Sequence, residues 1–275
     1  MRDGDNLENF KGKVTKADSY SLTVENISID NIKSLNLPDK DGKITVNNIS
    51  YSYDSWEAQV DAQGNIKSVT FNLSKDKAIA DPEKTVAEGY LLNAGSAINA
   101  RGIPYYMTQL NEFVRNFSEM FNQIESKGQN LNGDTPPTFF EAITNTAKVY
   151  DFSESEAYSK LPDGQTATIN SSSNTYYRMT AANFSVNKDV MNDVSLFATS
   201  TDYVKTDSCD IVDELKKLQS EKTVYRGDKA ESFLETIISN VSVDTEKAET
   251  YNKLYSNLEQ TIANQRTSVS GVDED

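Results

Sequence analysis

The chain has 275 residues, of which 27 are basic and 42 acidic, so its formal net charge is −15. This excess of negative charge argues against nucleic acid and anionic membranes as partners, because clustered lysines and arginines bind phosphate groups. The sequence contains no histidine and one cysteine, Cys209. It therefore lacks the commonest general base and zinc ligand, and it cannot form an internal disulfide. No apolar run approaches the ~18 residues that indicate a membrane-spanning helix.

Residues 11–75 alternate apolar and polar side chains in the manner of β-strands. The alternation is clearest in KITVNNISYSYDSWEAQVD and in IKSVTFNLS, which the turn at Asp61–Gly64 separates. Asp39–Gly42 has the same turn chemistry, in which glycine supplies the positive φ of a tight reversal. Its D-x-D-G order is similar to the start of a calcium loop, but the downstream ligands are missing. We therefore expect a small antiparallel β module without a metal site.

From residue 103 the hydrophobic period changes to that of a helix over about residues 103–127. Apolar residues step by four and three through three heptads, and Gly128 stands where a helix C-cap belongs. An isolated amphipathic helix of this length is marginal in water, so this seam requires a partner helix. The seam consists of Ile103, Met107, Leu110, Val114, Phe117, Phe121 and Ile124.

Residues 129–205 are rich in Asn, Ser, Thr and Gly, with scattered aromatic side chains. This composition predicts an irregular region that contains some β-structure. Gln165–Ile169 has the pattern of a strand, whereas Tyr176–Val186 is compatible with a strand or a turn.

Two helices are predicted to close the chain. The first begins at Asp207 or Ser208, either of which can act as an N-cap. The second runs from Asp228 to about Thr267, unless a joint at Asp244 divides it. Its second half carries a seam whose steps match those of the 103–127 helix. The members of this second seam are Ala248, Tyr251, Tyr255, Leu258 and Ile262.

These elements predict an α+β protein with two domains. The first is an antiparallel β domain at 1–95, and the second is a helical domain at 96–275 with an irregular, β-containing insertion at about 129–205. The simplest packing pairs the two seams as a long α-hairpin or small bundle of coiled-coil-like helices.

The chain offers few candidates for chemistry. Three pairs of acidic residues stand close together in the sequence: Glu154 and Glu156, Asp210 and Asp213, and Glu246 and Glu249. None stands in an apolar setting that would raise its pKa for acid–base work. Glycine-rich phosphate loops and the G-x-S-x-G nucleophile motif do not occur. We therefore predict no enzyme, no catalytic residue, no cofactor and no metal.

The aromatic residues of the β module leave a second interpretation open. The chain has 14 tyrosines, and Tyr51, Tyr53 and Trp56 lie close together on the predicted strands. Such residues could form a face that binds a glycan or a protein, as in an extracellular adhesin. Cross-strand packing inside a sheet explains the same pattern.

Four segments resemble one family in the same order along the chain. These are MRDGDN at the start, residues 102–140 with Ile103-Pro104, Leu131-Asn132-Gly133 and Phe139-Phe140, the segment AANFSVNKDVMNDVSLFATS at 181–200, and the closing NQRTSVSGVDED. They are similar to the flagellar hook-associated protein 1 family, the hook–filament junction proteins. The β module at 11–75 matches only in kind, because that insertion varies across the family. The resemblance implies a fragment that lacks both terminal helical regions.

The resemblance implies a structural protein with a flagellin-like or hook-associated-protein-like fold. Its expected role is self-assembly through helical and lateral contacts at the hook–filament junction. Expected partners are other copies of the chain, the hook protein and neighbouring junction or filament proteins, and an export chaperone that binds the missing C-terminal region. The expected location is extracellular, after export without a cleaved signal peptide, since MRDGDNLENF lacks an apolar core. The two seams are the residues expected to carry the contacts.

Overall fold

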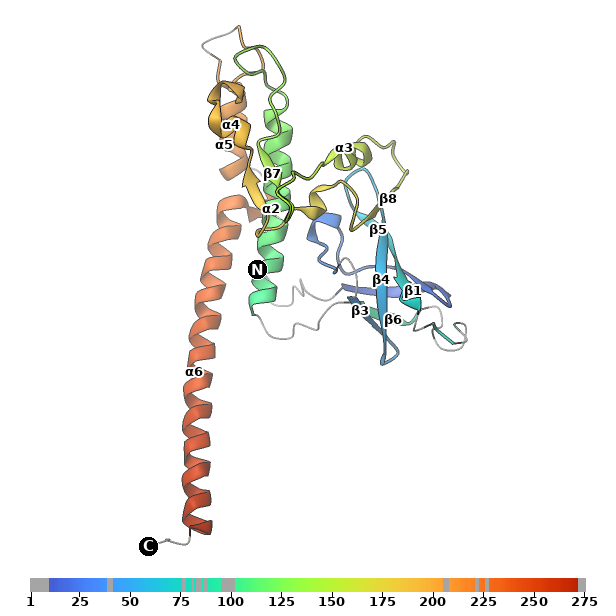
Figure 1. The fold of residues 1–275 in the computed structure, drawn as a ribbon, viewed down its shortest axis with the longest axis vertical. Coiled ribbons are helices and arrows are strands. Elements are labelled where there is room, and N and C mark those ends of the chain that lie inside the picture. The colour runs from blue at the N-terminus through green and yellow to red at the C-terminus, as the bar shows by residue number, and fades with distance from the viewer. Residues whose placement is uncertain are drawn as a thin grey trace. The chain divides into compact units, whose positions relative to one another are not determined.

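The computed structural model describes residues 10–38, 42–75, 78–80, 82, 86, 89–94, 102–204, 208–220, 223–225 and 228–271. The chain divides into two compact units, Met1–Glu231 and Ser232–Asp275. The first unit contains a β-barrel and a region built around one long helix, and the second consists of the greater part of the C-terminal helix (Figure 1).

Six antiparallel strands close into a barrel. Their order is β3-β6-β1-β2-β5-β4, and β3 pairs with β4 as well as with β6, which closes the sheet. Closure gives each of the six strands two neighbours, so none of them is an edge strand over its whole length. The strands are β1 (Phe10–Asp18), β2 (Ser21–Glu25), β3 (Gly42–Val46), β4 (Ile49–Val60), β5 (Ile66–Leu73) and β6 (Leu91–Ala94).

Large side chains fill the inside of the barrel. Because side chains alternate along a strand, one face of each strand points inward. Phe71 makes an edge contact with Phe10, with ring centroids 5.4 Å apart, and a tilted contact with Tyr53 at 5.1 Å. Tyr53 and Trp56 are fully buried and Tyr51 nearly so. These aromatics are therefore part of the barrel core and form no exposed face.

A seventh strand comes from the region that follows the long helix. β8 (Ala167–Asn170) pairs antiparallel with the second half of β4, where Ala58 faces Ile169. The 12-residue β4 is long enough to pair with β3 in its first half and with β8 in its second. Ile169 is buried and belongs to the core cluster of the barrel. The strand that the sequence predicts at Gln165–Ile169 is thus present, displaced by one or two residues.

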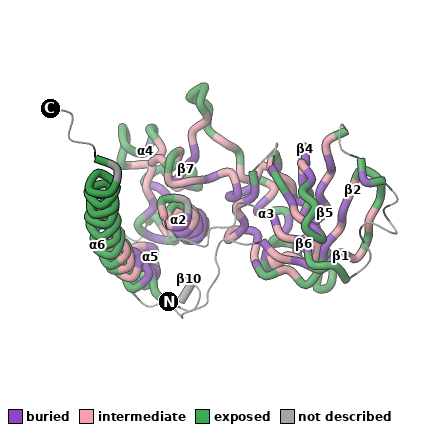
Figure 2. The backbone as a smooth tube through the Cα atoms, turned by 90° about the horizontal axis from the view of Figure 1, so that it is seen from below, coloured by how far each residue is buried: buried purple, intermediate pink, exposed green. Residues whose placement is uncertain are grey.

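The rest of the first unit surrounds helix α2 (Ile103–Glu125), which begins with a proline in its first turn. Figure 2 shows buried positions along α2 and along the strands of the barrel. β7 and β9 pair antiparallel, and β10 pairs with β11. The remaining elements are η1 (Ile32–Ser34), β7 (Phe140–Ala142), α3 (Ser153–Ser159), η3 (Tyr176–Arg178), β9 (Phe184–Val186), α4 (Lys188–Asn192), η4 (Val194–Leu196), α5 (Asp210–Ser220), β10 (Thr223–Tyr225) and β11 (Asp228–Lys229).

The C-terminal helix α6 (Ala230–Ser270) has 41 residues and runs through Asp244 without a break. The joint considered at that residue does not occur. At 1.5 Å per residue the helix is about 60 Å long. The N–H of Gly271 donates to the carbonyl of Thr267 at 2.6 Å, so the helix ends near the predicted point.

The expected fold class is wrong. The sequence predicts an α+β bundle of long coiled-coil-like helices with a small β domain, similar to flagellin and hook-associated proteins. The structure has a closed six-stranded antiparallel barrel and one C-terminal helix of 41 residues. Strand alternation predicts strands without predicting closure. Closure depends on the four-residue β6, which joins β1 to β3 and carries too few residues to show a pattern.

Local turn predictions have mixed outcomes. The turn at Asp61–Gly64 is confirmed, because Gly64 has a φ of 77° and the Asp61 carboxylate accepts the N–H groups of Gln63 and Asn65. Gly128 is not the cap of α2, which ends at Glu125. A Cβ at Gly128 would overlap Ala198, so close packing explains this glycine.

Several predictions fall on residues that the structure does not describe. The turn residues 39–41, the N-cap candidate Asp207 and the N-terminal segment MRDGDN lie outside the described residues. Gly42 is described, and its expected role in the turn is wrong, because it begins β3 without a positive φ.

Gly42 provides a test of the barrel closure. It faces Tyr53 across the β3–β4 pair, and a Cβ at this position would overlap the buried Tyr53 ring. We expect Gly42→Ala to lower the free energy of unfolding by about 1–3 kcal/mol, the usual cost of overpacking. Urea unfolding followed by the fluorescence of Trp56, the single tryptophan, measures the change. Lys43→Ala is the control, because Lys43 is exposed. Equal midpoints for both variants would contradict the close contact.

Candidate functional site

Helix α2 buries its polar side. Sequence periodicity predicts burial of the apolar seam, yet the side chains with the lowest exposure on this helix are mostly polar or charged. Burying such groups is costly unless they are hydrogen-bonded or paired. The buried polar residues of α2 are Gln109, Glu112, Arg115, Asn116, Ser118, Glu119, Asn122 and Glu125.

Arg115 ties α2 to two distant segments of the chain. Its Nε donates to the carbonyl of Met179 at 2.9 Å. Its Nη1 donates to the carbonyls of Leu35 at 2.7 Å and Lys33 at 3.0 Å. The guanidinium also lies over the Tyr177 ring, 4.5 Å from the centroid. One buried cation therefore holds the end of η1, the end of η3 and the middle of α2 together.

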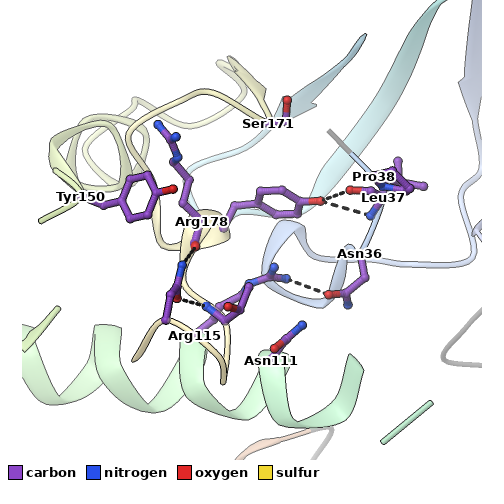
Figure 3. A pocket seen from close by; sticks show the side chains of 11 residues that line it. Asn36, Leu37, Pro38, Asn111, Arg115, Tyr150, Ser171 and Arg178 are labelled. Carbon is purple, nitrogen blue, oxygen red and sulfur yellow. Dashed lines mark hydrogen bonds between the residues drawn. The ribbon is translucent and has the colours of Figure 1, made fainter. Parts of the chain in front are cut away.

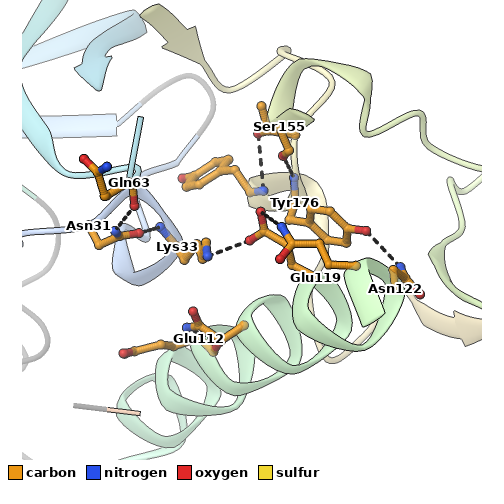
Figure 4. A network of polar contacts seen from close by, with 12 residues as sticks. Asn31, Lys33, Gln63, Glu112, Glu119, Asn122, Ser155 and Tyr176 are labelled. Carbon is orange, nitrogen blue, oxygen red and sulfur yellow. Dashed lines mark hydrogen bonds and ion pairs between the residues drawn. The ribbon is translucent and has the colours of Figure 1, made fainter. Parts of the chain in front are cut away.

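Two further side chains of α2, Glu119 and Asn122, extend this network along the helix (Figure 4). Lys33 and Glu119 form an ion pair at 2.6 Å, and both side chains are largely buried. Asn122 accepts the N–H of Phe140 at 2.9 Å and donates to its carbonyl at 2.8 Å. The Asn122 amide also donates to the hydroxyl of Tyr176. The polar side of α2 is thus a docking face within the first unit.

Glu125 ends the polar side and has a shifted pKa. Its Oε1 accepts the N–H of Ala198 at 2.6 Å, and within the described residues its Oε2 has no hydrogen-bond partner. Burial disfavours the ionised form and raises the pKa of Glu125 to about 7. The hydrogen bond from Ala198 lowers this pKa, but its effect is smaller than that of burial. This carboxyl group titrates near neutral pH, where an ordinary glutamate is ionised.

The first predicted seam lies in three different environments. Ile103 and Met107 are exposed, and Leu110 is half-buried. Val114, Phe117 and Phe121 are half-buried against a cluster around Phe140, Ala142, Tyr176 and Met179. Ile124 is buried with Ile211 and Leu218 of α5. Short segments and α5 therefore cover most of this seam.

The second predicted seam is exposed throughout. Ala248, Tyr251, Tyr255, Leu258 and Ile262 are all solvent-accessible, with 64% of Tyr255 and 51% of Leu258 exposed. Leu254 and Val269 are exposed beside and beyond them. Figure 2 shows the same exposure along α6. The second unit thus presents an apolar stripe at heptad spacing to solvent.

Of the paired carboxylates named from the sequence, Asp210 has a structural role. The hydroxyl and N–H of Thr201 donate to Asp210, which lowers the pKa of that carboxyl below its usual value. Glu246 and Glu249 are exposed on α6. Among the described residues, no group of three or more acidic or cysteine side chains could hold a metal ion. In the same part of the chain, no helix is long and apolar enough to cross a membrane. Cys209 is exposed.

Sequence reasoning missed a polar cavity beside Arg115. The cavity has a volume of about 420 Å³ and lies between α2, the segment after η1 and the segment around η3 (Figure 3). Its lining contains two arginines and no carboxylate. The lining residues are Asn36, Leu37, Pro38, Asn111, Arg115, Tyr150, Ser171, Tyr177, Arg178, Thr180 and Asn183. They come from parts of the chain up to 147 positions apart, counting from Asn36 to Asn183, so no local motif marks them.

Comparison with protein-family models and with curated protein sequences finds no match for this chain.

The raised pKa of Glu125 predicts that the stability of the folded chain depends on pH. Its pKa is higher in the folded chain, about 7, than the ordinary value of 4.5. Protonated Glu125 therefore contributes stability that is fully present below pH 4.5 and is lost as the pH rises through 7. We expect Glu125→Gln, which stays neutral and can still accept the Ala198 N–H, to be more stable than the parent chain at pH 8. The gain is on the order of 1 kcal/mol or more.

Thermal unfolding between pH 5 and pH 8 tests this expectation, with the pH chosen about the pKa of Glu125. Glu259→Gln is the matched control, because Glu259 is exposed on α6. A difference between Glu125→Gln and the parent that stays constant with pH would contradict the shifted pKa.

Proposed function

We propose that the chain is a structural subunit of the bacterial flagellum that acts at the hook–filament junction by self-assembly. The four segments that resemble hook-associated protein 1 support this role, since they occur in the family's order along the chain. The alternative, an extracellular adhesin with a ligand-binding β domain, draws no support from the aromatics first considered for it, because these are buried.

The single observation that carries an assembly role is the exposed stripe of α6. Heptad spacing of apolar residues is the pattern by which helices pair along their length. A helix of this kind gains most of its stability from packing its apolar face. The stripe Ala248, Tyr251, Tyr255, Leu258 and Ile262 leaves that face open to solvent.

The partner that best fits the stripe is a second copy of the same helix. An identical helix offers the same spacing of apolar residues, and symmetric self-association is the commonest form of assembly. In the flagellar role, further partners would be the hook protein and neighbouring junction or filament proteins. An export chaperone would bind C-terminal sequence, and nucleic acid and membrane would not take part. The location would be extracellular.

Leu258→Asp tests the stripe. A charge in the centre of a helical seam is costly, because association would bury it without a partner. We expect the parent chain to self-associate with rising concentration and Leu258→Asp to raise the dissociation constant at least tenfold, as measured by sedimentation velocity. Gln260→Asp adds the same charge two positions further on, on the opposite side of α6. Equal weakening by both variants would assign the effect to net charge.

Immunogold electron microscopy tests the location. We expect antibodies raised against the chain to label flagella of the source bacterium in one narrow band between hook and filament. Label along the whole filament would contradict the junction role. Label spread over the cell envelope away from flagella would favour the adhesin.

A further inference from the structure

The cavity beside Arg115 is a positively charged site on an acidic protein. The chain has six arginines and a net charge of −15. Two of these arginines, Arg115 and Arg178, line this one cavity, and none of its 11 lining residues is an aspartate or glutamate. A volume of about 420 Å³ lies within the range of cavities that hold small molecules.

Arg178 is the cation best placed to meet a ligand. The central carbon of its guanidinium lies over the Tyr150 ring, 4.1 Å from the centroid (Figure 3). Its Nη1 donates one hydrogen bond, to the carbonyl of Ser172 at 3.2 Å. A guanidinium has five N–H donors in a planar arrangement that matches carboxylate and phosphate oxygens. Most donors of Arg178 therefore remain available to an oxyanion.

Neutral donors surround the same space. Asn111 Oδ1 accepts the N–H of Ala181 at 2.9 Å, so its amide group is oriented with the NH₂ as a donor. Within the part of the chain that the structure describes, the Asn111 NH₂, the Ser171 hydroxyl and the Tyr150 hydroxyl make no hydrogen bond. These groups belong to α2 and to two loops, and they can bind the remaining oxygens and hydroxyls of a ligand.

We propose that this cavity binds a small organic oxyanion, a molecule with a carboxylate or phosphate group beside hydroxyl groups. Arg178 would hold the anionic group, and Asn111 with Ser171 would bind the neighbouring oxygens. Uncharged sugars would bind far more weakly, because they cannot form the charge-assisted hydrogen bonds. The site is independent of the assembly role of α6, since all of its residues lie between 36 and 183.

Isothermal titration calorimetry on the whole chain tests the proposal with three probes at constant ionic strength. The probes are inorganic phosphate, glucuronate and glucose, the last being the uncharged counterpart of glucuronate. We expect saturable binding of phosphate or glucuronate, and at least tenfold weaker binding of glucose. Binding of phosphate alone would assign a phosphoryl ligand, and binding of glucuronate alone would assign an acidic sugar.

Arg178→Gln supplies the decisive variant, and Arg266→Gln is the matched control because it removes the same charge from α6. We expect Arg178→Gln to weaken anion binding at least tenfold and Arg266→Gln to leave it unchanged. Arg178→Lys keeps the charge without the fork, and we expect intermediate binding. The proposal is overturned if no anion binds up to millimolar concentrations, if glucose binds as tightly as glucuronate, or if Arg178→Gln binds like the parent.

Discussion

The guanidinium of Arg115 is the contact on which the first unit depends. Its hydrogen bonds reach the carbonyl of Met179 on one side and those of Lys33 and Leu35 on the other. Residues 33–35 belong to the connection between β2 and β3, so this side chain attaches α2 to the barrel directly. A buried cation needs several strong acceptors to offset its lost hydration. Three backbone carbonyls supply them, and the surrounding loops are fixed as a result.

This attachment explains why α2 buries its polar side most deeply, although its sequence predicts burial of the apolar seam. Once Arg115, Glu119 and Asn122 face the barrel and its neighbouring loops, the apolar residues point to the other sides of the helix. Val114, Phe117 and Phe121 then meet aromatic residues of short segments that follow α2 in the chain. The same orientation places Arg115 and Asn111 in the wall of the cavity beside Arg178. The polar face and the cavity therefore have a common origin.

A feature of this fold can be predicted from the sequence when it is determined by residues close together in the chain. The strands at 43–73, the turn at Asp61–Gly64 and the two long helices follow from periodicity and turn chemistry over a few residues. Barrel closure does not, because it requires the short β6 to pair with two strands distant in sequence. Helix periodicity predicts an apolar face without predicting what covers it. The cavity is less predictable still, since its residues converge only after folding.

The two long helices differ in how their apolar sides are covered. An amphipathic helix is stabilised by packing of its apolar side. Much of the apolar side of α2 packs within the first unit, against aromatic residues of short segments and against Ile211 and Leu218 of α5. The exposed stripe of α6 spans at least the 15 residues from Ala248 to Ile262, about 20 Å along the axis. A net charge of −15 opposes close approach of identical chains, and that repulsion is weakened by salt. The proposed assembly through the stripe would therefore rely on short-range apolar contact, which salt would strengthen.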